Sequence, residues 1–241
     1  MKNVLILPVI HYQNGDQVFR NAAMAADAGC DGVFLIHMEG INDSLAQMGA
    51  NIKERHPQML VGANHLGEHA VYAMIRNIEA GLDMTWTDEQ LTHSDKSTDD
   101  SARLAHMRKP EGHMLFSGVA FKHQKRENFP RTAAREALKL GFIPTTSGAA
   151  TGVAADLEAL NHLRGGIGDA PLAVASGVTP ANFEDHAPHV THILIATGIS
   201  KSFYEFDRLL LEDLIHRRNK YAAAKASAVS PLELNTKEER S

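Results

Sequence analysis

Eight short apolar runs alternate with stretches of helical apolar spacing along most of the 241-residue chain. This alternation is the signature of β–α–β units, and nearly continuous apolar runs are typical of parallel strands buried on both faces. Eight units without a glycine-rich first turn favour a closed barrel over an open doubly wound sheet. The expected strands are residues 3–11, 32–38, 58–65, 82–88, 113–122, 142–147, 171–176 and 191–197.

The stretches between these runs predict the helices that cover the barrel. Apolar residues recur at helical spacing over residues 68–80, and Ser97 predicts the start of another helix. Residues 203–217 predict a final helix that turns its aromatic side chains to the core. The composition then becomes rich in Ser, Pro, Lys and Glu, which is typical of a mobile segment. The predicted organisation is a single (β/α)8 TIM barrel over residues 1–225 and a flexible C-terminal tail over residues 226–241.

Charge and composition restrict the partners and the location. The formal net charge is −5 and no basic stripe is present, so nucleic acid is not an expected partner. Pro8 and His11 interrupt the first apolar run too early for a signal peptide or a membrane span, so no membrane partner is expected. Cys30 is the only cysteine, and a chain without an internal disulfide fits a reducing compartment. We expect a cytoplasmic protein whose apolar helices support a homo-oligomer.

Two loops predict an anion site. Active sites of such barrels form at the C-terminal ends of the strands, and phosphate commonly binds after strands seven and eight. Here those strands are followed by Ser176-Gly177 and Thr197-Gly198. Glycine permits a close backbone approach, hydroxyl groups donate hydrogen bonds, and a helix start favours an anion. The sequence therefore predicts a phosphate cup, with the alternative that Gly177 and Gly198 are only turn residues.

The second strand ends in a possible acid/base pair. His37 and Glu39 are two residues apart and therefore share one face of an extended chain. If Phe34 and Ile36 face the helices, His37 and Glu39 point to the barrel mouth. A carboxylate and an imidazole in that place suit proton transfer. The alternative is a hydrogen-bonded pair that only fixes the loop.

The fourth and fifth strands end in further candidates. Alternation places Trp86 and Asp88 on one face, where Trp86 is either a platform for a flat base or sugar or part of the core. Asp88 is a candidate base, a ligand for hydroxyl groups, or a cap of the next segment. Lys122 and His123 end the fifth strand, and the pattern leaves open which of them faces inward. Lys122 suits a Schiff base if it is desolvated, but we favour a phosphate or carboxylate contact.

Polar residues at the remaining strand ends are candidate substrate ligands: His11, Asn64, and the Ser147-Gly148 pair that opens a hydroxyl-rich loop. We expect no cofactor and no metal, because the first strand lacks a His-x-His ending and the chain lacks a His-Glu-x-x-His motif. A weaker alternative is a metal-dependent hydrolase whose metal is bound by His11, His37, Glu39 and His65.

Three motifs resemble the BtpA/SgcQ family, whose members are similar to ribulose-phosphate-binding barrels. They are Lys122-His123, residues 146–152 (TSGAATG) and residues 175–182 (ASGVTPAN), and a weaker likeness extends from His11 to about residue 210. The resemblance implies a barrel that binds a phosphorylated ligand, but no settled chemistry, since one branch is linked to photosystem I accumulation and another to sugar uptake. The chain departs from the family at His37-Met38-Glu39, where Glu-Asn is usual, and at Asp88.

Together these features predict a metabolic enzyme that binds a phosphorylated sugar or nucleotide-like substrate and uses acid/base chemistry without metal. The two glycine loops would hold the phosphate, His37, Glu39 and Asp88 would transfer protons, and Lys122 or His123 would stabilise negative charge. Isomerisation, C–C cleavage and glycosidic-bond chemistry stay open. The alternative function is a non-catalytic assembly or regulatory protein that senses a phosphometabolite.

Overall fold

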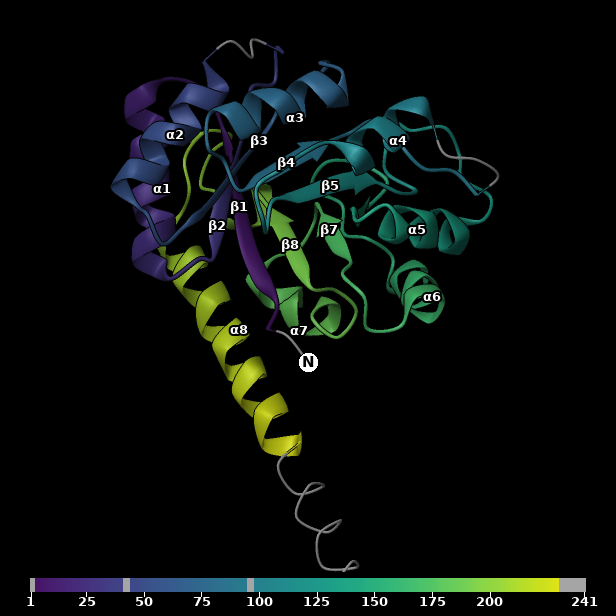
Figure 1. The fold of residues 1–241 in the computed structure, drawn as a ribbon. Coiled ribbons are helices and arrows are strands. Elements are labelled where there is room, and N and C mark those ends of the chain that lie inside the picture. The colour runs from purple at the N-terminus through teal and green to yellow at the C-terminus, as the bar shows by residue number, and fades with distance from the viewer. Residues whose placement is uncertain (1–2, 41–43, 95–97, 230–241) are drawn as a thin grey trace, which may run out of the picture.

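Eight parallel strands close into a barrel in sequence order in the computed structural model, which describes residues 3–40, 44–94 and 98–229 (Figure 1). Each strand pairs with the next, and the last pairs with the first. This arrangement confirms the predicted (β/α)8 TIM barrel. The strands are β1 (Leu5–His11), β2 (Gly32–Ile36), β3 (Leu60–Asn64), β4 (Met84–Thr87), β5 (Met114–Gly118), β6 (Ile143–Ser147), β7 (Ala173–Ala175) and β8 (His192–Ile195).

Helices surround the barrel in the described part of the chain (Figure 1). Several begin at a side chain that accepts a hydrogen bond from a free backbone N–H, as Asn14, Thr98 and Asp156 do. None of the described helices is long and apolar enough to cross a membrane. The helices are α1 (Gly15–Ala28), α2 (Leu45–Arg55), α3 (Ala70–Glu79), α4 (Asp99–His106), α5 (Pro130–Lys139), α6 (Leu157–Ile167), α7 (Phe183–His186) and α8 (Arg208–Val229), with short 3-10 turns η1 (Pro180–Asn182) and η2 (Thr197–Ile199).

The last helix differs from its prediction at both ends. It begins five residues later than expected, because the Asp207 carboxylate accepts hydrogen bonds from the N–H groups of Leu209 and Leu210 and so marks the helix start. The predicted boundary at residue 226 falls inside α8, which extends away from the barrel (Figure 1). The rest of the predicted tail, residues 230–241, and the predicted helix start at Ser97 lie outside the described residues.

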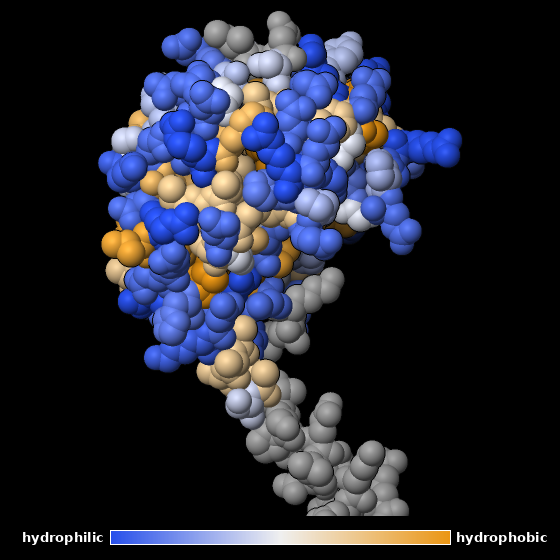
Figure 2. Space-filling view, turned by 90° about the vertical axis from the view of Figure 1, so that its left-hand side faces the viewer, coloured by the Kyte–Doolittle hydropathy of each residue, from blue (hydrophilic) through white to orange (hydrophobic). Residues whose placement is uncertain are grey.

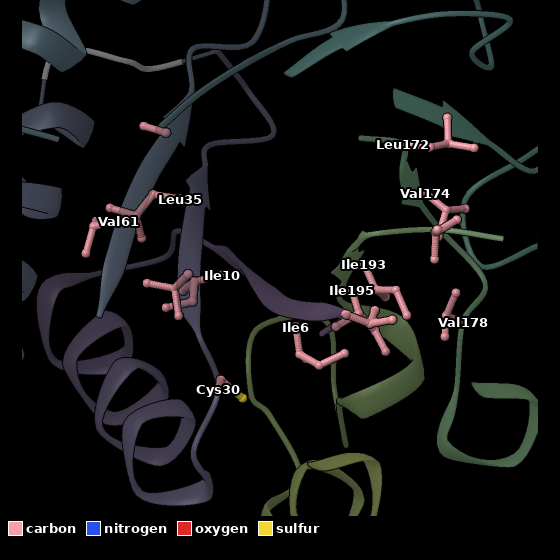
Figure 3. Packing of buried hydrophobic residues seen from close by; sticks show 14 of the residues in the cluster. Ile6, Ile10, Cys30, Leu35, Val61, Leu172, Val174, Val178, Ile193 and Ile195 are labelled. Atoms are coloured by element: carbon pink, nitrogen blue, oxygen red, sulfur yellow. The ribbon is translucent and has the colours of Figure 1, made fainter. Parts of the chain in front are cut away.

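Strand side chains alternate between two apolar layers. Ile10, Leu35, Val61 and Val174 belong to the layer between the strands and the helices (Figure 3). A second cluster fills the barrel interior and is formed by Leu7, Val9, Phe34, Ile36, Met84, Trp86, Phe116, Phe121, Ile143, Ala173, Ala175 and Leu194. Side chains at the C-terminal ends of the inward-facing rows therefore point into the barrel mouth.

The expected orientation of β2 was wrong, since Phe34 and Ile36 face the barrel interior rather than the helices. Gly62 of β3 makes this possible, because a Cβ at Gly62 would lie 2.5 Å from the Phe34 ring. Phe34 also meets the Phe116 ring edge-on at a centroid distance of 5.3 Å. The sequence of a strand shows that its side chains alternate between two faces. Which of the two faces is turned to the barrel interior depends on the residues of neighbouring strands.

The surface on the side of α1 and α2 is mainly hydrophilic, with separate hydrophobic areas (Figure 2). Exposed large apolar side chains occur on several helices, and Leu209 of α8 is 74% exposed. The homo-oligomer stays a prediction.

Candidate active site

The loops that follow β6, β7 and β8 touch one another through glycines. A Cβ at Gly148 would lie 2.0 Å from the Val153 carbonyl oxygen, and one at Gly198 would lie 1.9 Å from the Val178 carbonyl oxygen. A Cβ at Gly177, which has φ +69°, would lie 2.0 Å from the Ala154 backbone nitrogen. These distances leave no space for any side chain at the three positions. The glycines thus hold the three loops together at one side of the barrel mouth.

Hydroxyl groups and one ammonium group gather at these loops. Lys122 Nζ donates hydrogen bonds to Ser176 Oγ at 3.0 Å and to Thr151 Oγ1 at 3.1 Å. The Gly152 Cβ position is 3.6 Å from Thr197 Oγ1, so the loop after β8 adjoins the same place. We call Lys122, Thr151, Ser176 and Thr197, with the backbone of Gly177 and Gly198, the cup. The N–H of Gly177 makes no hydrogen bond within the described part of the chain.

The loop after β5 brings Lys122 to the cup. β5 ends at Gly118, four residues before the predicted strand end, and the chain then turns back on itself. A Cβ at Gly118 would lie 2.2 Å from Gln124 Nε2, so glycine makes room for that side chain. Gln124 Nε2 in turn donates to the Asp88 carbonyl oxygen at 2.7 Å, which ties the loop to the end of β4.

Lys122, not His123, faces the barrel mouth. The backbone N–H of Lys122 donates to Ser147 Oγ at 2.9 Å, and its side chain reaches the cup. His123 adopts a left-handed φ of +65° and is exposed. Burial lowers the pKa of the Lys122 ammonium, and the nearby Asp88 carboxylate opposes this shift. The structure thereby answers the question that the sequence left open.

Asp88 follows β4, and its carboxylate interacts electrostatically with Lys122. Its Oδ1 accepts a hydrogen bond of 3.2 Å from Asn64 Nδ2, at the end of β3. Burial raises the pKa of the Asp88 carboxyl, while Asn64, Lys122 and His123 act in the opposite direction. A partly buried carboxyl with a raised pKa beside a cation is suited to accept and return a proton.

His11 completes the group at the mouth. It pairs in register with Ile36, whose side chain faces the interior, so His11 lies on the inward face of β1. Burial lowers the pKa of the His11 imidazole, the Phe203 carbonyl opposes this shift, and Lys122 adds to it. We call His11, Asn64, Asp88 and Lys122 the central cluster.

His37 and Glu39 lie outside the central cluster, because β2 ends at Ile36 and its inward row does not include them. They line a separate polar pocket of about 180 Å³ with Tyr12, Gln13, Met38 and Tyr204. The Glu39 N–H donates to His37 Nδ1 at 3.3 Å, and the Glu39 side chain is exposed. The expectation that this pair points into the barrel mouth was wrong.

Trp86 belongs to the apolar cluster in the barrel interior, two residues before Asp88. Its side chain is 7% exposed and meets Phe34 and Phe121 edge-on at 5.9 and 6.3 Å. Of the two interpretations of Trp86, core packing therefore describes its position. Trp86 Nε1 has no hydrogen-bond partner among the described residues.

Ser147 and Gly148, two of the expected substrate ligands, line a cavity outside the central cluster. This cavity of about 510 Å³ is lined mainly by the end of β6, the loop after it and α6, including Val153 and Leu163, and Pro130 of α5 also lines it. It contains none of the central-cluster side chains. The described residues include no group of three His, Cys, Asp or Glu side chains placed to hold a metal ion.

Sequence reasoning missed three residues that shape the site. Thr151 lies in a loop recognised only as rich in hydroxyl groups, although it contacts Lys122. Gln124 has no signal in the sequence, since its role depends on the space above Gly118. Phe203 was assigned to a helix, but it precedes α8 and stacks on His11 at a centroid distance of 4.2 Å.

Several solved structures are similar to this chain over most of its length. Phosphoribosyl anthranilate isomerase from Thermus thermophilus is 11% identical with a TM-score of 0.65, over 90% of this chain and 100% of that one. KGPDC from Streptococcus mutans is 10% identical with a TM-score of 0.68, over 91% of this chain and 99% of that one. A 4-hydroxy-2-oxoglutarate aldolase/2-deydro-3-deoxyphosphogluconate aldolase is 12% identical with a TM-score of 0.61, over 88% and 92%.

At these identities the likeness establishes a shared fold. No protein-family model matches the sequence, and no curated protein matches it. The resemblance to the BtpA/SgcQ family therefore rests on the three motifs.

Proposed function

We propose that this protein is an enzyme that binds a phosphorylated sugar or a nucleotide-like metabolite at the C-terminal face of the barrel and transfers protons on it. The observation that carries the proposal is the Lys122 ammonium, which donates to Ser176 and Thr151 of the cup and also interacts electrostatically with the Asp88 carboxyl. One small substrate thus reaches both the groups proposed to bind its phosphate and the group proposed to transfer its proton.

The cup fits a phosphate group by its chemistry. A phosphate needs several hydrogen-bond donors and positive charge, and the hydroxyls of Thr151, Ser176 and Thr197 and the Lys122 ammonium supply both. The unpartnered Gly177 N–H is a further donor in the same loop within the described part of the chain. Backbone N–H groups and glycine-rich turns are common anion ligands.

Asp88 is the proposed proton-transfer group. Of the three residues expected to transfer protons, it is the one kept in this role, since His37 and Glu39 line a separate pocket. The raised pKa of Asp88 moves its titration toward neutral pH, where a carboxyl can act both as acid and as base. Asn64 fixes the carboxyl by a hydrogen bond, and Lys122 stabilises negative charge that develops beside it.

The names of two similar enzymes support the substrate class, since they include a phosphoribosyl compound and a phosphogluconate. The proposed chemistry uses side chains alone, with neither metal nor cofactor, and leaves open whether the reaction is isomerisation, C–C cleavage or glycosidic-bond chemistry. The proposed location is the cytoplasm.

The test is a calorimetric screen of the full chain with matched pairs of sugars and sugar phosphates, followed by turnover assays of each binder. We expect binding of phosphorylated members only, with turnover that Asp88→Asn reduces by about 100-fold or more, as for loss of a general acid or base. Binding without turnover would favour the regulatory alternative. Equal binding of phosphorylated and unphosphorylated sugars would contradict the proposal.

A further inference from the structure

We infer that His11 is the base that removes a proton from the substrate, and that Phe203 is the residue that positions it. This inference rests on the proposed function and deepens it, because a base next to a phosphate site selects a substrate with an acidic C–H bond. The substrate class is then an aldose or ketose phosphate whose carbonyl group adjoins that C–H.

The hydrogen bond of His11 determines where its proton lies. His11 Nδ1 is 2.9 Å from the Phe203 carbonyl oxygen. A carbonyl oxygen can only accept, so Nδ1 carries the hydrogen and Nε2 of the neutral imidazole carries the free lone pair. Burial lowers the pKa of His11 and so favours the neutral ring at neutral pH. A neutral imidazole with a free Nε2 is the form required of a general base.

Phe203 holds the ring in this orientation by a second contact. The rings of His11 and Phe203 stack at a centroid distance of 4.2 Å and an interplanar angle of 17°. Stacking from one side and a hydrogen bond at Nδ1 together restrict rotation of the imidazole. Nε2 lies on the edge of the ring opposite the Phe203 carbonyl.

Two buried amides of α1 fix the segment that carries Phe203. The Tyr204 carbonyl oxygen accepts from Gln17 Nε2 at 2.6 Å and from Asn21 Nδ2 at 2.7 Å. Asn21 Oδ1 accepts from the Phe206 N–H at 3.1 Å. Gln17 and Asn21 are fully buried, so their amides are committed to this segment. The chain next to Phe203 is therefore anchored on the barrel rather than free to move aside.

Few charged side chains act on His11 within the described part of the chain. Lys122 acts on it from the loop after β5, and Asp88, which follows β4, acts on Lys122. On the segment of Phe203, Glu205 pairs with Arg20 of α1 at 2.5 Å, and Lys201 is exposed. The cation at Lys122 disfavours an imidazolium before the reaction and attracts the negative charge that appears during it.

The step is balanced within the central cluster and the substrate. The C–H bond next to the carbonyl breaks, its proton forms an N–H bond at His11 Nε2, and the electron pair moves to the carbonyl oxygen. The resulting enolate is stabilised by the Lys122 ammonium. The Asp88 carboxyl, whose pKa is raised by burial, donates a proton to this oxygen, so the step ends with the neutral enediol, the His11 imidazolium and the Asp88 carboxylate. No oxidant, reductant or co-substrate is required.

The test has two measurements on the full chain. Imidazole nitrogen NMR, with the His11 signal assigned by its loss in His11→Asn, should show the Nδ1–H form in the wild type. Phe203→Ala keeps the backbone carbonyl that accepts from Nδ1, so it should keep the Nδ1–H form but change the ring-proton shifts of His11, because the stacked ring is lost. Phe129→Ala, which removes an aromatic ring that is 66% exposed, should change neither. An Nε2–H form in the wild type, or unchanged His11 ring-proton shifts in Phe203→Ala, would overturn the inference.

The second measurement is deuterium incorporation from D2O into the sugar phosphates that bind in the calorimetric screen. His11→Asn keeps a donor for the Phe203 carbonyl but removes Nε2, so we expect about 100-fold slower exchange and unchanged affinity. Unchanged exchange with intact binding would overturn the role of His11 alone. A screen in which no sugar phosphate binds would overturn the proposed function and this role with it, whereas the tautomer measurement would stand.

Discussion

Lys122 Nζ lies 3.0 Å from Ser176 Oγ, so the loop after β5 reaches past the end of β6 to the loop after β7. This contact joins the candidate phosphate site to the candidate proton-transfer groups. Burial lowers the pKa of His11, the same ammonium adds to this shift, and it also acts on Asp88. A single side chain thereby links both functions proposed for the barrel mouth.

Replacement of this lysine should weaken phosphate binding. In Lys122→Met the stem keeps its packing but the charge-assisted hydrogen bonds are lost, which corresponds to a loss of about 10-fold to 100-fold in affinity. Calorimetry with inorganic phosphate measures the effect. Lys139→Met, which removes an exposed ammonium on α5, is the control and should bind as the wild type does. Equal affinities of the two variants would contradict a role of Lys122 at the cup.

The carboxyl of Asp88 should make stability depend on pH. Its pKa is raised in the folded state above the ordinary value of 3.8, so the folded protein holds a proton that the unfolded chain releases. Stability therefore falls as the pH rises from about 4 through the raised pKa. Asp88→Asn has no carboxyl to titrate, so its stability should not fall in this way. Its free energy of unfolding should be higher than that of the wild type at pH 7, and the difference should disappear near pH 4. Urea unfolding across this range is the measurement, and a difference that grew toward acid pH would refute the assignment.

The alternation of apolar runs with helical segments was sufficient to predict the barrel and the end of the barrel at which its polar residues gather. It did not predict the phase of β2, because the Phe34 ring turns inward only where Gly62 of the neighbouring strand leaves room. The placement of Trp86 and Asp88 on one face followed from the period of two and is confirmed by the contact of Asp88 with Asn64.

The parts of the site that could not be predicted depend on contacts between distant loops. Lys122 reaches the cup only because the chain turns at Gly118 and folds over Gln124. Phe203 has the apolar spacing of a helix, yet the Asp207 cap starts the helix after it. Gly177 and Gly198 were expected to give a ligand access to the backbone. The structure adds a second reason for glycine, since a neighbouring loop fills the space where a side chain of either residue would lie.

The close contact at Gly177 should make this position intolerant of any side chain. Gly177→Ala combines a left-handed φ of +69° with a Cβ that would lie 2.0 Å from the Ala154 nitrogen. Gly112 has a similar φ of +83° but nothing within 4 Å of its Cβ position, so Gly112→Ala isolates the backbone effect, about 1 kcal/mol. We expect Gly177→Ala to lose at least about 2 kcal/mol more in urea unfolding, as for overpacking. Equal losses in the two variants would show that the loops do not pack as described.

The single thiol should be inert in the folded protein. Burial, with a smaller contribution from Asp31, raises the pKa of Cys30 to about 12. Because the thiolate is the reactive form, a thiol reagent at pH 8 should react with less than about a tenth of the chains in native buffer and with one thiol per chain in denaturant. Absorbance of the released chromophore gives the count. Rapid reaction of the native protein would mean that Cys30 is not enclosed between the strands and helices.

The most direct test of the phosphate cup is a titration of the ¹⁵N-labelled full chain with inorganic phosphate, followed by backbone amide NMR. We predict saturable shifts that are largest at Thr151, Gly177 and Gly198, abolished in Thr151→Asp, and retained in Ser227→Asp, which adds the same charge on the exposed part of α8. Shifts centred instead on the cavity beside α5 and α6, or none at these loops, would contradict the assignment of the cup as a phosphate site.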